Sequence, residues 1–149
     1  MMKIILFQPE IPQNTGNIIR TCAVTGCQLV LVEPLGFSLS DRWLKRAGLD
    51  YHEGVDICTI DDLAKFIETE NKPFVFFSSK ATNLYTQISY APDHLLIFGS
   101  ESKGFPANFF DQWPQFFVKI PMLEGKRCLN LATSVGIGVF EAWRQNSFT

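Results

Sequence analysis

Short apolar stretches alternate along this chain with segments in which apolar residues recur at helical spacing. The apolar stretches predict strands at 4–7, 28–32, 55–58, 74–77, 95–98 and 116–120. The helical spacing predicts helices at 17–25, 40–47, 61–70, 106–112 and 131–145. The chain opens with a strand, a helix and a second strand, an order that implies parallel pairing. The pattern therefore predicts an α/β fold with a mostly parallel sheet and helices on both faces.

Particular residues at the ends and inside these segments support the predicted helices. Asn130 is placed to cap the last helix, and Thr59 stands three residues before Asp62, which is capping-box spacing. The last helix contains Gly136 and Gly138, each of which lowers helix stability by about 1 kcal/mol relative to Ala. We expect these glycines to permit close packing against a neighbour, and that neighbour could be a second copy of the same helix.

Four polar loops begin where predicted strands end, at Gln8, Ser78, Gly99 and Pro121. In an open α/β sheet, ligands bind beyond the carboxyl ends of the strands. The last loop also leads into a helix start, where backbone N–H groups are available to a ligand. We therefore expect these loops to converge on one small-molecule site.

The loop from Gly99 to Gly104 contains a glutamate between two serines. It is not a P-loop, because no Lys-Ser or Lys-Thr pair follows the second glycine, and it is not a G-x-G-x-x-G dinucleotide motif. Its spacing fits a tight turn after a strand as well as it fits a ligand-binding loop. Glu101 can accept hydrogen bonds from a ligand or cap a neighbouring segment.

Two further groups of polar residues are candidates for a functional site. In the first, Arg20 lies one turn into a predicted helix and can reach back over the loop that holds Asn14. The second group combines positive charge with aromatic rings, as phosphate contact and base stacking require. It comprises Arg42, Trp43, Lys45, Arg46, Tyr51 and His52. Taken alone, each group is better explained by a solvent-exposed helix.

The composition narrows the class of protein. A length of 149 residues fits one domain, 1–149, with a sizeable core, and 14 phenylalanines predict an aromatic-rich core or interface. A net charge of -2 argues against a generally basic nucleic-acid-binding protein but is compatible with a local basic face.

The cysteines show no C-x-x-C pair and no metal-ligand spacing, so we expect no metal. Four scattered thiols favour a reducing compartment, and no stretch approaches the length of a membrane span. The composition therefore predicts a cytoplasmic protein that is not bound to a membrane.

Three stretches together resemble the motifs of the SPOUT superfamily of RNA ribose methyltransferases. They are 9–20 (PEIPQNTGNIIR), 98–104 (FGSESKG) and 120–131 (IPMLEGKRCLNL). Two more, 46–52 (RAGLDYH) and 141–145 (EAWRQ), resemble the small single-domain enzymes that methylate the ribose 2′-hydroxyl of the tRNA wobble cytidine or uridine.

The resemblance implies a C-terminal trefoil knot that forms a pocket for S-adenosyl-L-methionine, and an obligate homodimer whose active site uses both subunits. By position it implies cofactor contacts at Phe77, Gly99, Glu101, Ile120, Cys128 and Leu129. It implies that Arg20 acts on the substrate ribose or its phosphate. The expected contacts with tRNA are Asn14, Arg42, Lys45, Arg46, Lys103, Lys126 and Arg127.

The chain departs from the resemblance at two positions. Cys128 stands where a serine is expected, and Phe140 stands where relatives often have tyrosine, so roles for those hydroxyls do not carry over. The matched motifs contain no evident carboxylate or histidine base. Two other classes stay open: a non-catalytic α/β module that binds a nucleotide or RNA through the same loops, and a flavodoxin-like protein that would hold flavin.

Overall fold

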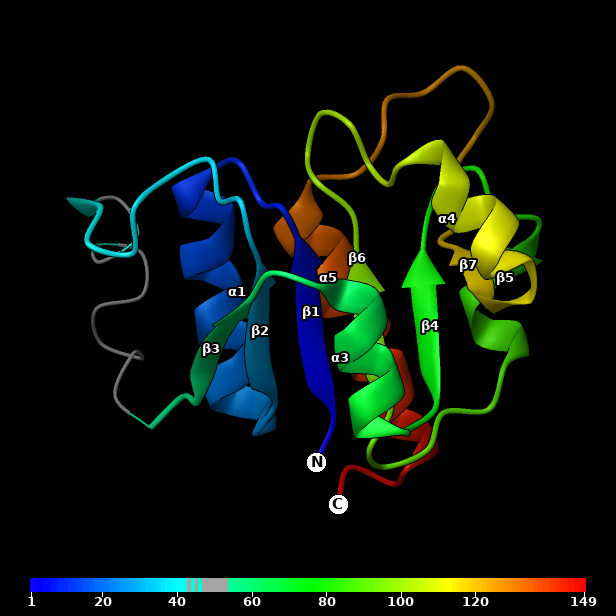
Figure 1. Cartoon of the computed structure of the whole chain (residues 1–149). Helices are drawn as coiled ribbons and strands as arrows, with labels where there is room; N and C mark the ends of the chain where they lie inside the picture. The colour runs from blue at the N-terminus through cyan, green and yellow to red at the C-terminus, as the bar shows by residue number, and fades with distance from the viewer. Residues whose placement is uncertain (43, 45, 47–53) are drawn as a thin grey trace.

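The structure is a computed structural model that describes residues 1–42, 44, 46 and 54–149, and in that part all strand pairs are parallel (Figure 1). The strands of its sheet are β1 Lys3–Phe7, β2 Gln28–Val32, β3 Ile57–Ile60, β4 Phe74–Phe77, β5 Asn83–Leu84, β6 Leu95–Phe98 and β7 Phe117–Lys119. The helices are α1 Pro12–Thr25, α3 Leu63–Glu70, α4 Ala107–Gln112 and α5 Leu131–Gln145, with short 3-10 helices at Tyr85–Gln87 and Pro114–Phe116. This arrangement confirms the predicted fold class.

Helices cover both faces of the sheet. Because side chains alternate along a strand, Ile4 and Leu6 pack toward α1 and α5, whereas Ile5 and Phe7 pack toward α3 and α4. Figure 1 shows α3 in front of the sheet and α5 behind it. Burial on both sides explains why the strands appear in the sequence as continuous apolar runs.

The face beneath α3 and α4 contains a dense aromatic cluster. Phe76 is fully buried and stacks on Trp113 and Phe117, with ring centroids 5.0 and 4.8 Å apart. Phe7 meets Phe109 of α4 edge to face at 5.0 Å. The abundance of phenylalanine is thus explained by an aromatic core, one of the two predicted alternatives.

The strand order places several loops at one edge of the sheet. The order is β3-β2-β1-β6-β4-β7-β5, so the chain leaves β1 toward β2 on one side and leaves β6 toward β7 on the other. Such a reversal between adjacent strands creates a crevice beyond their carboxyl ends. The loops after β6 and β7 lie at the top of Figure 1, and both termini lie near the opposite edge.

Helix α1 begins at Pro12, five residues earlier than predicted. The loop expected at 9–16 therefore ends in a helical turn that contains Asn14. Proline is favoured in the first turn of a helix, where its missing N–H has no intrahelical partner to lose. The turn signals in this stretch were real, but they mark the start of the helix.

Other boundaries also differ from the prediction. The cap of α3 is Asp62, whose side chain accepts a hydrogen bond from the Lys65 N–H at 3.0 Å. Thr59 belongs to β3, which runs two residues later than predicted, so a capping box at Thr59 is wrong. Strand β5 and the 3-10 helix after it were not predicted. Residues 43, 45 and 47–53, on which part of the helix predicted at 40–47 falls, lie outside the described residues.

Candidate functional site

A cavity of about 500 Å³ lies at the carboxyl edge of the sheet. This volume is within the range of small-molecule sites. Residues 77–80, 98–105 and 128–131 form its walls, together with Ile11, Asn14, Phe110, Ile120, Met122 and Ser134. The predicted convergence of the strand-end loops on one cavity is confirmed, and its use as a small-molecule site stays a prediction.

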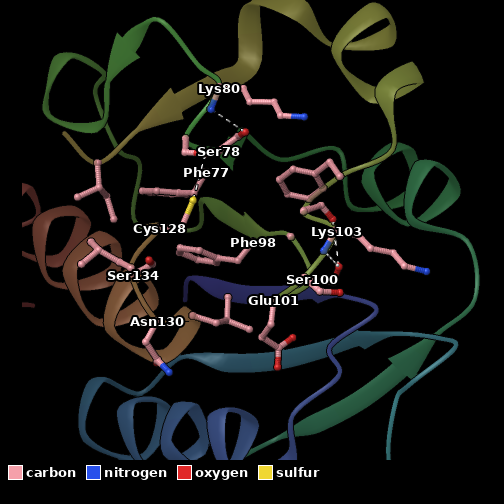
Figure 2. A pocket seen from close by; sticks show the side chains of 18 of the residues that line it. Phe77, Ser78, Lys80, Phe98, Ser100, Glu101, Lys103, Cys128, Asn130 and Ser134 are labelled. Carbon is pink, nitrogen blue, oxygen red and sulfur yellow. Dashed lines mark hydrogen bonds between the residues drawn. The ribbon is translucent and has the colours of Figure 1, made fainter. Parts of the chain in front are cut away.

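Two stacked rings form the floor of this pocket. Phe77 and Phe98 lie with their centroids 4.5 Å apart and their planes inclined by 15°, and both project into the pocket in Figure 2. Gly138 of α5 packs on them, because a Cβ at this position would lie 2.8 Å from the ring of Phe77. Close packing is thus confirmed for Gly138, whereas a Cβ on Gly136 would meet nothing within 4 Å.

The loop after β6 closes as a tight turn. Ser100 and Gly104 exchange backbone hydrogen bonds of 3.0 and 3.1 Å, and Gly104 has a φ of 62°. A Cβ on Gly99 would lie only 2.7 Å from the backbone of Gly104, so glycine is required there. This turn directs Glu101 toward the start of α1.

Glu101 joins this loop to the segment that begins α1. Its carboxylate accepts hydrogen bonds from the backbone N–H groups of Glu10 at 2.9 Å and Ile11 at 2.7 Å, and from the amide of Asn14 at 3.3 Å. Of the two roles predicted for Glu101, the structure shows the capping of a neighbouring segment. A contact with a cofactor stays a prediction.

Asn14 extends the same network to the third motif. It is buried, and its side-chain oxygen accepts a hydrogen bond from the Asn130 amide at 2.9 Å. The Asn130 oxygen in turn accepts from the N–H groups of Ala132 and Thr133, which confirms Asn130 as the cap of α5. Because both polar groups of Asn14 have partners in the chain, a direct contact with RNA stays a prediction.

The third motif contributes the most exposed wall of the pocket. Ile120, Cys128 and Leu129 all line the pocket, as expected for cofactor contacts. The Cys128 thiol is exposed and lies 3.5 Å from the Ser79 hydroxyl, whereas Cys22 is buried and burial raises the pKa of its thiol. These two cysteines therefore occupy opposite environments, one at the pocket and one in the core.

The positively charged residues predicted to act on RNA occupy different places. Arg20 is exposed on α1 and does not line the pocket of its own chain. Lys103 lines the pocket, and Lys126 and Arg127 are exposed in the adjoining loop. Arg42 and Arg46 are exposed as well, but Lys45 lies outside the described residues.

Sequence reasoning missed Lys80, which lines the pocket from the loop after β4. Figure 2 shows Lys80 and Lys103 on two walls, with their side chains extending away from the centre. The position of Lys80, two residues after Ser78 at a predicted strand end, was a signal that could have identified it.

Among residues 1–42, 44, 46 and 54–149, no group of three potential ligands is placed to hold a metal ion, and no helix is long and apolar enough to cross a membrane.

Residues 1–140 match the SpoU rRNA Methylase family. The chain belongs to this family. Within it, a tRNA (cytidine(34)-2'-O)-methyltransferase from Yersinia pestis is 47% identical over 152 residues, which cover 97% of this chain and 94% of the relative. The resemblance found in the sequence is thereby confirmed.

Solved structures of SpoU-like proteins share the same fold. One, described as giving structural insights into the 2-OH methylation of C/U34 on tRNA, is 41% identical, with a TM-score of 0.90 over 100% of this chain and 98% of the other. An AdoMet-bound rRNA methyltransferase from Sinorhizobium meliloti is 25% identical, with a TM-score of 0.84 over 96% of this chain and 56% of that one. The trefoil knot stays a prediction.

Proposed function

We propose that this protein transfers a methyl group from S-adenosyl-L-methionine to the ribose 2′-hydroxyl of the wobble nucleotide, position 34, of tRNA. The observation that carries the proposal is the pocket at the carboxyl edge, where all three motifs of the sequence meet. The name of the Yersinia pestis relative supports the choice of substrate, because the identity extends over nearly the whole chain.

The pocket suits this cofactor in size and chemistry. A cavity of about 500 Å³ accommodates a molecule that joins a nucleoside to an amino acid. The rings of Phe77 and Phe98 offer an apolar surface, and the backbones of Gly99, Ile120 and Leu129 surround it with hydrogen-bonding groups. When bound, the cofactor supplies a methyl group attached to positively charged sulfur.

Arg20 is the residue that we propose acts on the substrate. A ribose hydroxyl is a weak nucleophile unless its proton is accepted or its developing charge is stabilised. A guanidinium is always charged and donates hydrogen bonds in a fork, so it suits phosphate binding and charge stabilisation better than proton abstraction. In the described part of the chain, the one carboxylate that lines the pocket is Glu101, which is already hydrogen-bonded, and we assign no base.

We propose a homodimer in which Arg20 acts at the pocket of the partner subunit. Arg20 is exposed and does not line its own pocket, which supports action across an interface. Helices α1 and α5 lie against each other on one face of the sheet and expose the apolar side chains of Val24 and Phe140. Apolar residues on adjacent helices favour contact with a second copy.

The rim of the pocket would hold the tRNA backbone. Lys80, Lys103, Lys126 and Arg127 supply positive charge around the opening, although the whole chain carries a net charge of -2. Binding to tRNA should therefore weaken steeply as the salt concentration rises.

The free cysteines fit a reducing compartment, and we propose the cytoplasm.

The proposal is tested with methyl-labelled S-adenosyl-L-methionine and bulk tRNA. We expect label in RNA, recovered after digestion as 2′-O-methylcytidine or 2′-O-methyluridine from position 34. The Arg20→Ala variant should bind cofactor normally and lose at least about a hundredfold in turnover. Cofactor binding without labelled RNA in the wild-type protein would instead support a non-catalytic binding module.

Mixed dimers test the action of Arg20 across the interface. Wild-type protein alkylated at the exposed Cys128 has a blocked pocket but keeps its arginine. After subunit exchange with equal amounts of Arg20→Ala protein, half of the dimers are mixed and each has one complete site, so about a quarter of wild-type activity should return. No return of activity would mean that Arg20 serves the pocket of its own chain.

A further inference from the structure

Helix α1 begins without a side-chain cap from its own segment. The N-cap residue is Ile11, an apolar side chain that makes no capping hydrogen bond. The first turn of any α-helix leaves backbone N–H groups without intrahelical partners, and this stretch needs acceptors from elsewhere. The backbone that leads into the helix is therefore open to a contact from outside α1.

Glu101, ninety residues later in the sequence, supplies that contact. Its two oxygens accept from the Glu10 and Ile11 N–H groups, so the carboxylate is held by the backbone that leads into the helix. Negative charge at a helix N-terminus is also favoured by the helix dipole. Hydrogen bonds to an ionised acceptor are stronger and more directional than neutral ones.

The same two segments are joined in the reverse direction. The Glu10 carboxylate accepts from the Ser102 hydroxyl at 2.7 Å and from the Ser102 N–H at 3.3 Å, and these bonds hold the pKa of Glu10 below its usual value. Each segment thus presents a carboxylate to backbone of the other. This reciprocal clamp, formed by Glu10, Glu101 and Ser102, fixes both the distance and the orientation between the loop after β6 and α1.

A clamp at the start of α1 controls the position of Arg20. Arg20 lies nine residues after Ile11, which is about 13 Å along the helix axis at 1.5 Å per residue. A rigid helix transmits a shift or tilt at its first turn to the end that carries the arginine. In the proposed homodimer, such a shift displaces Arg20 relative to both pockets, because α1 also belongs to the face that meets the partner.

We infer that Glu101 is a positioning residue that holds α1, and with it Arg20, at the geometry needed for methyl transfer. This inference rests on the proposed function. Both carboxylate oxygens accept hydrogen bonds from the chain itself, so we assign Glu101 an action through α1 and not on the reacting groups. Loss of the clamp should reduce turnover more than it reduces cofactor affinity, since misplacement by about 1 Å costs up to a hundredfold in rate.

The test is the Glu101→Gln variant, in which an amide NH2 replaces one acceptor oxygen. We expect hydrogen exchange of the Glu10 and Ile11 amides to accelerate in ligand-free protein. Turnover should fall at least about tenfold while cofactor affinity stays within about threefold. Glu68→Gln is the matched control, because Glu68 is exposed on α3 and the charge change is identical.

A second variant separates positioning from simple capping. Ile11→Ser offers α1 a local cap, since serine is a strong N-cap residue. Added to Glu101→Gln and compared with Ile11→Ser alone, it should slow exchange of the Gln13 and Asn14 amides, which a serine cap reaches, but leave turnover low. Recovery of turnover would show that Glu101 only caps the helix and would overturn the inference.

The remaining outcomes also decide the question. In Glu101→Gln, hydrogen exchange of the Glu10 and Ile11 amides could stay unchanged while cofactor affinity falls in proportion to turnover. That result would mean that Glu101 binds the ligand, and it would overturn the inference. If the wild-type protein transferred no methyl group to tRNA, the proposed function would fail. The exchange measurement would still establish whether Glu101 holds α1.

Discussion

Hydrogen bonds between distant segments cross both edges of the sheet, and two of these networks, one at each edge, differ in kind. In the network at the carboxyl edge that joins the loop after β6 to α1, the acceptors are the half-buried carboxylates of Glu10 and Glu101. At the amino edge the Gln145 side chain accepts from the Tyr90 N–H at 2.9 Å and donates to the Ile88 carbonyl at 3.1 Å. There His94 is buried, and its Nδ1 accepts from the Ala91 N–H.

The difference separates stability from function. A buried neutral group that loses its partner is costly, because water cannot replace the lost bond. A half-buried carboxylate beside an open pocket regains water when its partner is removed, so its loss changes geometry more than stability. Substitutions at the amino edge should therefore lower the free energy of unfolding, and substitutions at the carboxyl edge should lower activity.

The largest expected effect on stability comes from His94. Burial lowers the pKa of His94 to about 4, so on acidification the unfolded chain takes up a proton before the folded chain does. The stability that depends on neutral His94 is therefore fully present above about pH 6.5. It is lost as the pH falls toward 4, which lowers the free energy of unfolding by about 3 kcal/mol. Urea unfolding across this range should show the loss.

The His94→Asn variant is the control for that measurement. Asparagine keeps an acceptor for the Ala91 N–H but cannot be protonated, so its stability should depend less on pH between 6.5 and 4. Equal pH dependence in the two proteins would show that carboxylates, and not His94, cause the acid sensitivity.

The next effect concerns Gln145 at the end of α5. The Gln145→Ala variant leaves the Tyr90 N–H and the Ile88 carbonyl without partners, and should lower the free energy of unfolding by about 1–3 kcal/mol. Gln115→Ala, at an exposed position, should change it by less than about 0.5 kcal/mol. If folded Gln145→Ala protein lost methyl transfer, the claim that the amino edge serves stability and the carboxyl edge serves activity would be contradicted.

The smallest effects are expected at the two glycines of α5. At Gly138, alanine would press on the Phe77 ring, so Gly138→Ala should cost about 1 kcal/mol and weaken cofactor binding. At Gly136 a Cβ has open space, so Gly136→Ala should raise the stability of the isolated chain by about 0.5–1 kcal/mol. If the dimer interface includes the surface of α5 around Gly136, the added methyl group should shift Gly136→Ala toward monomer. Size-exclusion chromatography would measure this shift.

Local features were predictable from the sequence because each depends on neighbouring residues. The buried strands follow from their apolar runs, and Asn130 follows from its place before an amphipathic segment. The start of α1 was misplaced because Pro12 was interpreted as part of a turn, and because the segment before the helix is held by Glu101, a partner ninety residues away that no local signal reports. The strand order was unpredictable for the same reason.

The composition of the pocket was largely predictable, but its connections were not. Gly99, Ile120 and Cys128 were placed by resemblance and do line the cavity. Asn14 was assigned to RNA, yet the structure gives its amide two partners within the chain. A sequence shows which side chains are polar, whereas their hydrogen-bond partners depend on the three-dimensional contacts.

The most direct test of the central claim is a crystal structure with S-adenosylhomocysteine, the demethylated form of the cofactor. Density is expected above the rings of Phe77 and Phe98, enclosed by the loops at Gly99, Ile120 and Leu129. Density in a second cavity, between the start of α3 and α4, or at the amino edge would contradict the account.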